Sequence, residues 1–247
     1  MSEPSQRATN LLLTISGVIL LIAGAAAGWA FERGRTAGGS QEAFEARVRN
    51  YLVSHPEVLA EAAEAYRKKS TGQQVTDVAD ALEKPFPGAV LGNPQGTLVL
   101  VEFSDFACTY CRASVADVEA LIAENPDLKV VIRELPIIAP TSPDAARWGL
   151  AAAQQGKYPA FHKAMFAIGH TDMASIEAAA RNAGLDLDRA RADAASPAIN
   201  AELAANVDLA RKLGIDGTPA WVAGDQLASG ALGKVELGKL VAQAKGK

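Results

Sequence analysis

The pattern of hydrophobic and polar positions changes along the chain and divides it into segments. Residues 11–30 are an apolar run without charge. In residues 41–70 the apolar side chains recur three and four positions apart, which is typical of one face of a helix. Pro56 interrupts this second pattern, so we expect two helices joined by a bend. The apolar positions of the pattern are Phe44, Val48, Tyr51, Leu52, Val58, Leu59 and Tyr66.

The next segment carries the start of a larger domain. Glycine and proline are frequent between Thr71 and Pro94, which marks a boundary. Residues 97–103 and 128–135 are nearly continuous apolar runs, as expected of strands buried on both faces. A helical pattern lies between them, over about residues 108–124. Strand, helix and strand joined by short links predict a βαβ unit with parallel strands.

The pattern changes again after the second strand. Residues 142–213 are rich in alanine at helical spacing and contain no strand pattern, so we expect about four inserted helices. Residues 220–223 and 226–229 flank Gly224-Asp225 and predict a β-hairpin. A last helix is expected over about residues 234–244. The βαβ and ββα halves can share one sheet, with the inserted helices as a cap.

The expected domain organisation follows from these segments. It comprises a tail and apolar segment (1–36), a helical arm (41–70) and an α/β domain (90–247) that carries the insertion (142–213). The arm has two alternatives: it packs on its own domain, or it forms a homo-oligomer, because a helix pair between an apolar segment and a domain has little else to bury its apolar face against.

Composition excludes some classes of function. The 247 residues are 49% hydrophobic and 21% charged, with a formal net charge of −4 and no basic stripe, so we expect no nucleic-acid partner. The three histidines, His55, His162 and His170, lack the spacing of metal ligands. We therefore expect no metal site and no cofactor.

The apolar run Leu11–Ala30 is long enough to cross a membrane, because helical residues rise ~1.5 Å each and the hydrocarbon core is ~30 Å thick. An uncleaved anchor is favoured, since the preceding residues are only weakly basic and apolar character continues to Phe31. The alternative is a cleaved signal peptide, with Ala25 and Ala27 at the processing site. In the first case an inner-membrane anchor holds the α/β domain in the periplasm or another extracytoplasmic space, and in the second the domain is secreted.

The two cysteines, Cys108 and Cys111, are the strongest candidates for chemistry. A fold stabilised by disulfides would spread its cysteines over distant segments, whereas these lie three positions apart where a strand passes into a helix. Cys108 is expected at the helix N-terminus, where its thiolate forms at lower pH than that of a free cysteine. Cys111 lies one turn later and is more enclosed. The outer sulfur would exchange with a substrate disulfide or thiol, and the inner sulfur would resolve the mixed disulfide.

Glu102 adds a candidate acid. It lies near the end of an apolar strand, six residues before Cys108. A buried carboxyl has a raised pKa and can relay the proton of Cys111. The alternative is a strand-end residue that reaches solvent.

These motifs resemble a known family. Residues 103–111, FSDFACTYC, paired with Gly217-Thr218-Pro219-Ala220, are similar to the DsbA-like branch of the thioredoxin superfamily. The resemblance covers about residues 94–247 and implies a thioredoxin-like α/β fold with an inserted helical domain. It implies that Cys108 is the nucleophile, that Cys111 resolves, and that Pro219 is cis with Thr218 beside the dithiol. Residues 51–59 are similar to the arm of bacterial proteins related to ScsC, some of which oligomerise and shuffle wrong disulfides.

The expected activity is protein thiol–disulfide exchange, with exported proteins as substrates that contact Thr218, Pro219, Thr109 and Tyr110. The strongest oxidants of the family carry Pro-His between the cysteines, whereas this chain has Thr109-Tyr110. Without that histidine the thiolate is less stabilised, which predicts a weaker oxidant. Oxidase and isomerase, and also reductase, stay open, as does the redox partner. Two other functions stay open: Cu(I) binding by the two thiolates for metal tolerance, and a structural tether.

Overall fold

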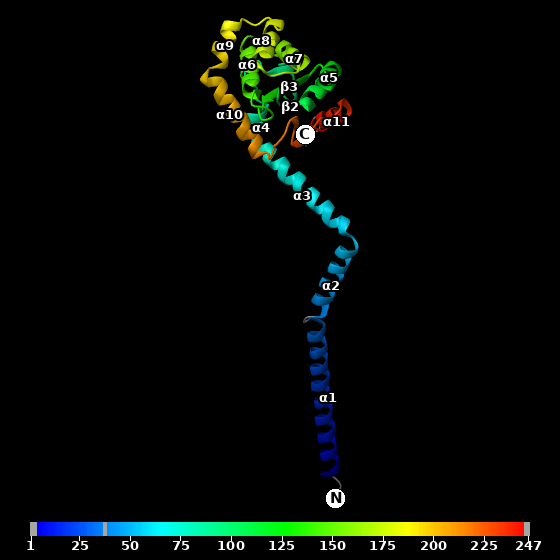
Figure 1. Ribbon diagram of the computed structural model, residues 1–247. Coiled ribbons are helices and arrows are strands. Elements are labelled where there is room, and N and C mark those ends of the chain that lie inside the picture. Colours follow the sequence, from blue (N-terminus) through cyan, green and yellow to red (C-terminus); the bar gives the residue numbers. More distant parts are fainter. Residues whose placement is uncertain (1–3, 37–38, 245–247) are drawn as a thin grey trace. The chain divides into compact units, whose positions relative to one another are not determined.

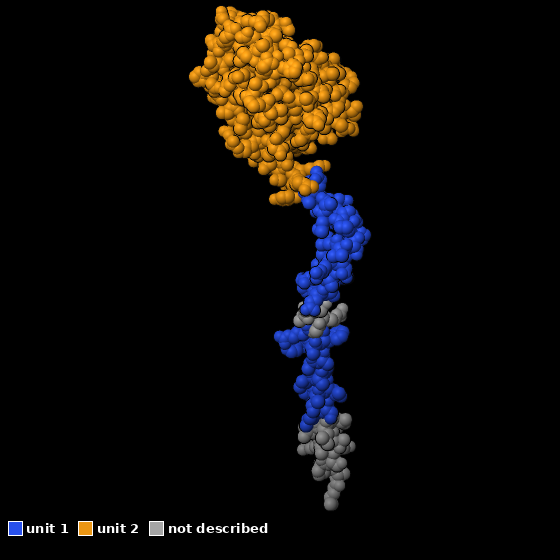
Figure 2. Space-filling view, viewed as in Figure 1, with its two compact units in different colours: residues 1–65 blue, residues 66–247 orange. Residues whose placement is uncertain are grey.

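The computed structural model describes residues 4–36 and 39–244. The chain divides into two compact units, Met1–Ala65 and Tyr66–Lys247 (Figure 2). Residues 1–3, 37–38 and 245–247, at the edges of the predicted segments, lie outside the described part.

Unit 1 is helical. It contains α1 (Pro4–Thr36), α2 (Gly39–Ser54) and the first part of α3 (Pro56–Asp77) (Figure 1). Within α1, residues Ile15–Arg33 have a mean hydropathy of 1.7 and lie exposed, so this helix is long and apolar enough to cross a membrane or to serve as a signal. The predicted bend is confirmed, because α2 ends at Ser54 and α3 begins at Pro56.

Unit 2 is built on a five-stranded mixed sheet with the order β1-β3-β2-β4-β5. The central pair, β2 (Leu98–Ser104) and β3 (Leu128–Glu134), is parallel, with Glu102 opposite Ile132 and Ser104 opposite Glu134. The other pairs are antiparallel. They involve β1 (Val90–Gly92), β4 (Ala220–Ala223) and β5 (Gln226–Ser229). Pairing of β2 with β4 puts Phe103 opposite Ala220, which joins the two halves of the domain.

Helices cover both faces of the sheet. Side chains of β2 and β3 alternate between the faces. Leu100 and Ile132 lie in one cluster with α5 (Thr109–Glu124) and α11 (Lys234–Ala244). Val101 and Val131 lie in a second cluster with the end of α3, α4 (Ala79–Glu83) and the end of α10 (Pro197–Lys212). The sheet is therefore buried on both sides, as the continuous apolar runs predicted.

The insertion between β3 and β4 is helical, as predicted, and contains α6 (Ser142–Gln154), α7 (Tyr158–Ile168), α8 (Met173–Asn182), α9 (Leu187–Ala194) and α10. These are five helices instead of about four. Four breaks separate them: three contain Gly156, Gly169 and Gly184, each with a positive φ, and the fourth precedes Pro197. The predicted fold class, a thioredoxin-like α/β domain with a helical insertion, is confirmed.

Residues 71–94, predicted as a boundary, contain more structure than expected. They include the last turns of α3, α4 and strand β1, which pairs with β3. Val75 and Leu82 are buried in the second cluster. An element of three to five residues is too short for a periodic pattern to indicate it.

Candidate functional site

Cys108 lies at the junction of β2 and α5, as predicted. Helix α5 begins at Thr109, and Cys108 is its N-cap residue. The Cys108 sulfur accepts a hydrogen bond from the backbone N–H of Cys111 at 3.4 Å. At a helix N-terminus unpaired N–H groups favour a negative charge. The local backbone therefore places the first sulfur where a thiolate is stabilised.

The turn before Cys108 is held by Asp105, which is buried. Its carboxylate accepts hydrogen bonds from the backbone N–H groups of Ala107, at 2.8 Å, and of Ile137 and Ile138, at 2.8 and 2.9 Å. Its carbonyl accepts from the Cys108 N–H at 2.9 Å. Asp105 thus fixes the loop of the dithiol to the loop after β3. Sequence reasoning missed this residue, although an aspartate at the start of a turn is a signal for such bonds.

Thr218 lies directly against Cys108. The Cys108 thiol donates a hydrogen bond to the Thr218 carbonyl oxygen at 3.2 Å. The peptide bond between Thr218 and Pro219 is cis, which confirms the geometry that the resemblance implied. Both residues are buried. The hydroxyl of Thr218 has no hydrogen-bond partner among the described residues.

The four residues of the Cys108–Cys111 motif differ in exposure. Cys108 is 4% exposed and Cys111 is 1% exposed, and both are free thiols. Tyr110 is 65% exposed, and Thr109 is exposed as well. The first sulfur therefore lies nearer the surface than the second, and the two intervening side chains point outward. Their contact with substrate stays a prediction.

Glu102 lies behind the second cysteine. It is 3% exposed, which excludes the alternative of a solvent-reaching strand end. Burial raises the pKa of Glu102 to about 8. Burial, and next the charge of Glu102, raise the pKa of the Cys111 thiol. Each group therefore favours its protonated form, and ionisation of one opposes ionisation of the other.

A second buried acid lies on the neighbouring strand. Glu134 ends β3 and accepts a hydrogen bond from the hydroxyl of Tyr158 at 2.6 Å. Burial raises the pKa of Glu134 well above its ordinary value, and the same cause raises that of Tyr158. Sequence reasoning missed this pair, because only the fold brings α7 against the end of β3.

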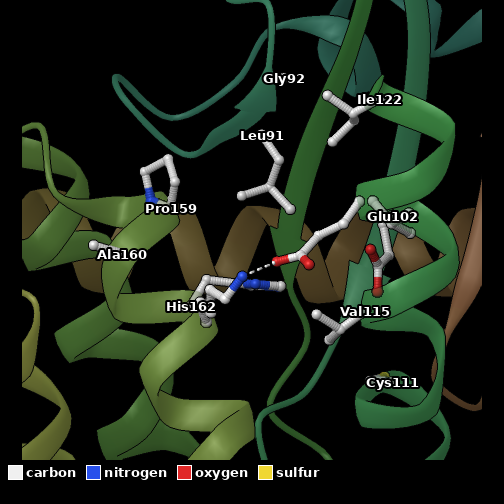
Figure 3. A pocket seen from close by; sticks show the side chains of 12 residues that line it. Leu91, Gly92, Glu102, Cys111, Val115, Ile122, Pro159, Ala160 and His162 are labelled. Atoms are coloured by element: carbon white, nitrogen blue, oxygen red, sulfur yellow. Dashed lines mark hydrogen bonds and ion pairs between the residues drawn. The ribbon is translucent and has the colours of Figure 1, made fainter. Parts of the chain in front are cut away.

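A cavity of about 380 Å³ reaches Glu102 and Cys111 between α5, α7 and β1. Figure 3 shows Val115 and Ile122 of α5 facing Pro159, Ala160 and His162 of α7. Leu91 and Gly92 of β1 also line the cavity. Burial lowers the pKa of His162 to about 4, so its imidazole is neutral at neutral pH. His162 contacts the rings of Phe106, Tyr158 and Phe166 and therefore packs in the core.

Comparison with known proteins gives two family matches. Residues 99–239, more than half of the chain, match the DSBA-like thioredoxin domain. Residues 41–70 match the N-terminal domain of the copper resistance protein ScsC. The second match coincides with the predicted arm, and the resemblance given by the sequence is confirmed.

Several solved structures are similar. A thioredoxin-like oxidoreductase from Silicibacter pomeroyi DSS-3 is 38% identical, with a TM-score of 0.65 over 68% of this chain and 98% of that one. The catalytic domain of Proteus mirabilis ScsC is 29% identical, with a TM-score of 0.63 over 71% and 99% of the two chains. The thiol-disulfide exchange protein α-DsbA2 from Wolbachia pipientis is 28% identical, with a TM-score of 0.66 over 72% and 97%.

The curated relatives are longer proteins. The Na⁺/H⁺ antiporter NhaA of Herminiimonas arsenicoxydans is 32% identical over 155 residues, which are 61% of this chain and 25% of that protein. NhaA 3 of Salinispora tropica is 31% identical over 137 residues, or 53% and 21%. The chain thus spans about a quarter or less of the length of these relatives. The similarity therefore does not indicate that this chain is an antiporter. Because the fold, the dithiol loop and the match over residues 99–239 agree, the chain belongs to the DSBA-like thioredoxin domain family.

Proposed function

We propose that the protein exchanges disulfides in exported proteins through Cys108 and Cys111. The observation that carries this proposal is the contact of the Cys108 thiol, at the N-terminus of α5, with the Thr218 carbonyl beside Pro219. The chain belongs to a family of thiol–disulfide oxidoreductases, and α-DsbA2 of Wolbachia pipientis is itself a thiol-disulfide exchange protein. The family membership and this relative both support thiol–disulfide exchange.

Cys108 is the exchanging sulfur in this mechanism. Its thiolate attacks a substrate disulfide, a bond forms between Cys108 and one substrate sulfur, and the other substrate sulfur leaves as a thiolate. The N–H of Cys111 stabilises the negative sulfur, whereas the Thr218 carbonyl accepts only from the protonated thiol. These two contacts favour different protonation states.

Cys111 is the resolving sulfur. It attacks Cys108, the Cys108–Cys111 disulfide forms, and the substrate leaves with the electron pair of the broken bond. In the opposite direction a substrate thiolate attacks Cys108, and Cys111 leaves as the thiolate. Glu102 accepts the proton of Cys111 in the first case and returns it in the second. Burial of both groups supports this role, since an isolated charge on either is costly.

The substrate is proposed to lie along Thr218 and Pro219. An extended peptide at this position would meet the backbone of Thr218 and the exposed side chains of Thr109 and Tyr110. The exposed aromatic ring of Tyr110 offers apolar contact area to residues that flank a substrate cysteine.

The test uses two single-cysteine variants. With a scrambled, disulfide-containing protein as substrate, Cys111→Ser is expected to accumulate a mixed disulfide on Cys108, visible as a mass increase without reductant. Cys108→Ser is expected to accumulate none and to lose turnover. Equal trapping by both variants, or turnover by Cys108→Ser, would contradict the assigned roles.

The direction of exchange is the finer part of the proposal. We infer an oxidase or isomerase that is less oxidising than relatives with histidine between the cysteines, because Thr109-Tyr110 supplies no cationic donor to the thiolate. Equilibration of the dithiol with glutathione measures this directly. A pair that stays oxidised even in a strongly reducing glutathione buffer has a potential too low to oxidise substrate thiols and would contradict the oxidase reading.

The membrane role of α1 is also proposed. Its exposed apolar stretch supports an inner-membrane anchor, with the thioredoxin domain on the extracytoplasmic side, where disulfides persist. Release of the thioredoxin domain from washed membranes by high salt would argue for the alternative, a cleaved signal and secretion. Retention until detergent is added is the expected result.

Cu(I) binding is the second candidate, favoured by the arm's match to a copper resistance protein. Two thiolates suffice for Cu(I), which accepts low coordination. A titration with Cu(I) under a competing chelator, with Cys108→Ser as control, separates this from exchange. The metal role would be favoured if the wild type binds Cu(I) tightly, Cys108→Ser loses this binding, and the wild type shows no disulfide exchange.

A further inference from the structure

We propose that Ser104 is a further catalytic residue of the exchange, and that its hydroxyl donates a hydrogen bond to the Cys111 sulfur while that sulfur carries negative charge. The proposal rests on the dithiol exchange proposed above and deepens it. It assigns a role to a buried hydroxyl that a mechanism with Cys108, Cys111 and Glu102 leaves without one.

The position of Ser104 on the central strand is the first argument. Ser104 ends β2 and lies two residues after Glu102, so both side chains lie on the same face of the strand. Helix α5 covers this face, and Glu102 and Cys111 line one cavity there (Figure 3). The backbone of Ser104 is held in place, because its carbonyl accepts a hydrogen bond from the Leu135 N–H at 2.8 Å. The strand therefore presents the Ser104 hydroxyl on the side of the sheet that Cys111 occupies.

The state of this hydroxyl is the second argument. Ser104 is 2% exposed, and its oxygen makes no hydrogen bond within the part of the chain that the structure describes, where both cysteines are free thiols. A buried hydroxyl without a partner costs free energy. This cost falls when a charged acceptor forms nearby, because hydrogen bonds to charged groups are the stronger ones. The Ser104 hydroxyl is thus a donor that is already in place for a charge that only the reaction creates.

Two ionisable groups lie close enough to respond to this hydroxyl. Burial raises the pKa of Glu102, and the Ser104 hydroxyl lowers it. Burial and the charge of Glu102 raise the pKa of the Cys111 thiol, and the Ser104 hydroxyl again acts in the opposite direction. A serine has one O–H to donate, and ionisation of either group opposes ionisation of the other. One donor therefore suffices for the pair, because it can bond to whichever group carries the charge.

A second hydroxyl near Cys111 is less suited to a test. Thr218 also has a buried hydroxyl without a partner among the described residues, and it opposes the rise of the Cys111 pKa as Ser104 does. The backbone of Thr218, however, belongs to the proposed substrate surface, so a substitution there would change substrate binding as well. Ser104 lies on the buried central strand and can be changed without altering that surface.

The step that Ser104 assists is the departure of Cys111 and its reverse. When a substrate thiolate attacks Cys108 of the oxidised protein, a bond forms between these two sulfurs. The electron pair of the broken Cys108–Cys111 bond stays on Cys111, to which Ser104 donates until Glu102 supplies a proton. In the resolving direction Cys111 passes through the same charged state before it attacks Cys108. The two electrons move between sulfur atoms only, so no further oxidant or reductant takes part.

Three variants separate this role from packing. Ser104→Ala removes the hydroxyl and nothing else, and because that hydroxyl has no partner the reduced variant should melt at or above the wild-type temperature. Ser104→Thr keeps the hydroxyl and should keep most of the wild-type rate. Ser114→Ala is the matched control, because Ser114 is a buried serine of α5 whose hydroxyl already donates to the Tyr110 carbonyl at 3.0 Å.

The assay is the reaction of the reduced full-length protein in detergent with Ellman's reagent, an aromatic disulfide. Attack by Cys108 releases a first coloured thiolate, and resolution by Cys111 releases a second. We expect Ser104→Ala to keep the first rate and to slow the second by about tenfold. This is less than the loss of one donor to a full oxyanion causes, because the attacking sulfur keeps only part of its charge at the transition state. The equilibrium constant with glutathione should stay unchanged, because Cys111 is uncharged both as a disulfide and as a protonated thiol.

The outcomes are distinguishable. A second release at the wild-type rate in Ser104→Ala would overturn the role of Ser104. An equal slowing by Ser104→Thr or by Ser114→Ala would assign the effect to packing and would overturn it too. A lower melting temperature of reduced Ser104→Ala would show that the hydroxyl is already paired, which also contradicts the proposal. A wild-type protein with no second release would instead refute the proposed dithiol exchange.

Discussion

The Cys108 thiol and the Thr218 carbonyl oxygen lie 3.2 Å apart, although 110 residues separate them in the chain. Antiparallel pairing of β2 with β4 causes this contact, because Phe103 opposite Ala220 brings the end of one strand to the start of the other. The site therefore forms only when both halves of the thioredoxin fold are assembled around the helical insertion.

Alkylation should distinguish the two cysteines. We expect iodoacetamide at neutral pH to modify Cys108 and to spare Cys111, because burial and the charge of Glu102 raise the pKa of the Cys111 thiol. Peptide mass spectrometry after short exposure measures the ratio. In urea both cysteines should react equally, which serves as the control. Preferential labelling of Cys111 in the folded protein would contradict the arrangement.

Glu102 should make the stability of the reduced protein depend on pH. Its pKa is about 8 in the folded state and ~4.3 in an unfolded chain. The folded state therefore holds the proton more tightly, and stability falls as pH rises between these values. The loss of stability is absent at a pH below the pKa of the unfolded state and complete at a pH above the pKa of the folded state. The slope reaches about 1.4 kcal/mol per pH unit.

Glu102→Gln removes this titration. We expect the variant to be more stable than the wild type at pH ~8 and the difference to shrink toward pH ~5. Urea unfolding of the reduced proteins, followed by tryptophan fluorescence, measures it. Glu83→Gln, at an exposed carboxylate on α4, is the matched control and should leave the pH profile unchanged. A variant with the same pH slope as the wild type would show that Glu102 does not titrate in this way.

The sequence predicted the parts of the site that have a local signal. Residues 97–103 and 128–135 indicated the central strands because their apolar runs are long, and Gly224-Asp225 indicated the hairpin. Cys108 was expected at a helix N-terminus, where the structure places it. The cis bond before Pro219 was predicted from the family resemblance, since no local sequence pattern indicates it.

The parts that were missed depend on contacts between distant segments. Strand β1 has three residues and exists through its pairing with β3. Glu134 at a strand end resembles any surface carboxylate in sequence, and its burial follows from the packing of Tyr158 against it. The cavity needs α5, α7 and β1 together, so no single segment could indicate it.

Tyr158 should stabilise the domain through its hydroxyl. Tyr158→Phe keeps the ring and removes the hydrogen bond to Glu134, leaving a buried carboxyl without that donor. We expect a loss of about 1–3 kcal/mol in the free energy of unfolding, measured by urea titration. Tyr66→Phe, at a 74% exposed tyrosine, is the control and should change little. If Tyr158→Phe leaves the free energy of unfolding unchanged, Glu134 has another hydrogen-bond donor in the variant.

Arg133 of β3 should stabilise the packing of α4 against the sheet through its hydrogen bonds. It is 3% exposed and bonds the backbone carbonyls of Ala81 and Leu82 and the carboxylate of Glu202, the last at 2.8 Å. Arg133→Met leaves these acceptors unpaired, and we expect a loss of about 3 kcal/mol in unfolding free energy. Arg211→Ala breaks an exposed ion pair with Asp208 and should cost at most about 0.5 kcal/mol. Similar losses for both variants would contradict the assignment.

The arm should decide the number of subunits. Tyr51 and Leu59 are 56% and 54% exposed, and burying such side chains between copies contributes about 2 kcal/mol each. If the arm forms an oligomer, chemical crosslinking of the full chain in detergent micelles should give multimers, and Tyr51→Ser with Leu59→Ser should give monomers. Arg49→Ser with Glu61→Ser, at exposed positions of the same helices, is the matched control and should leave the multimers intact. A wild-type chain that stays monomeric would favour the alternative, in which the arm packs on its own domain and contributes no contact between subunits.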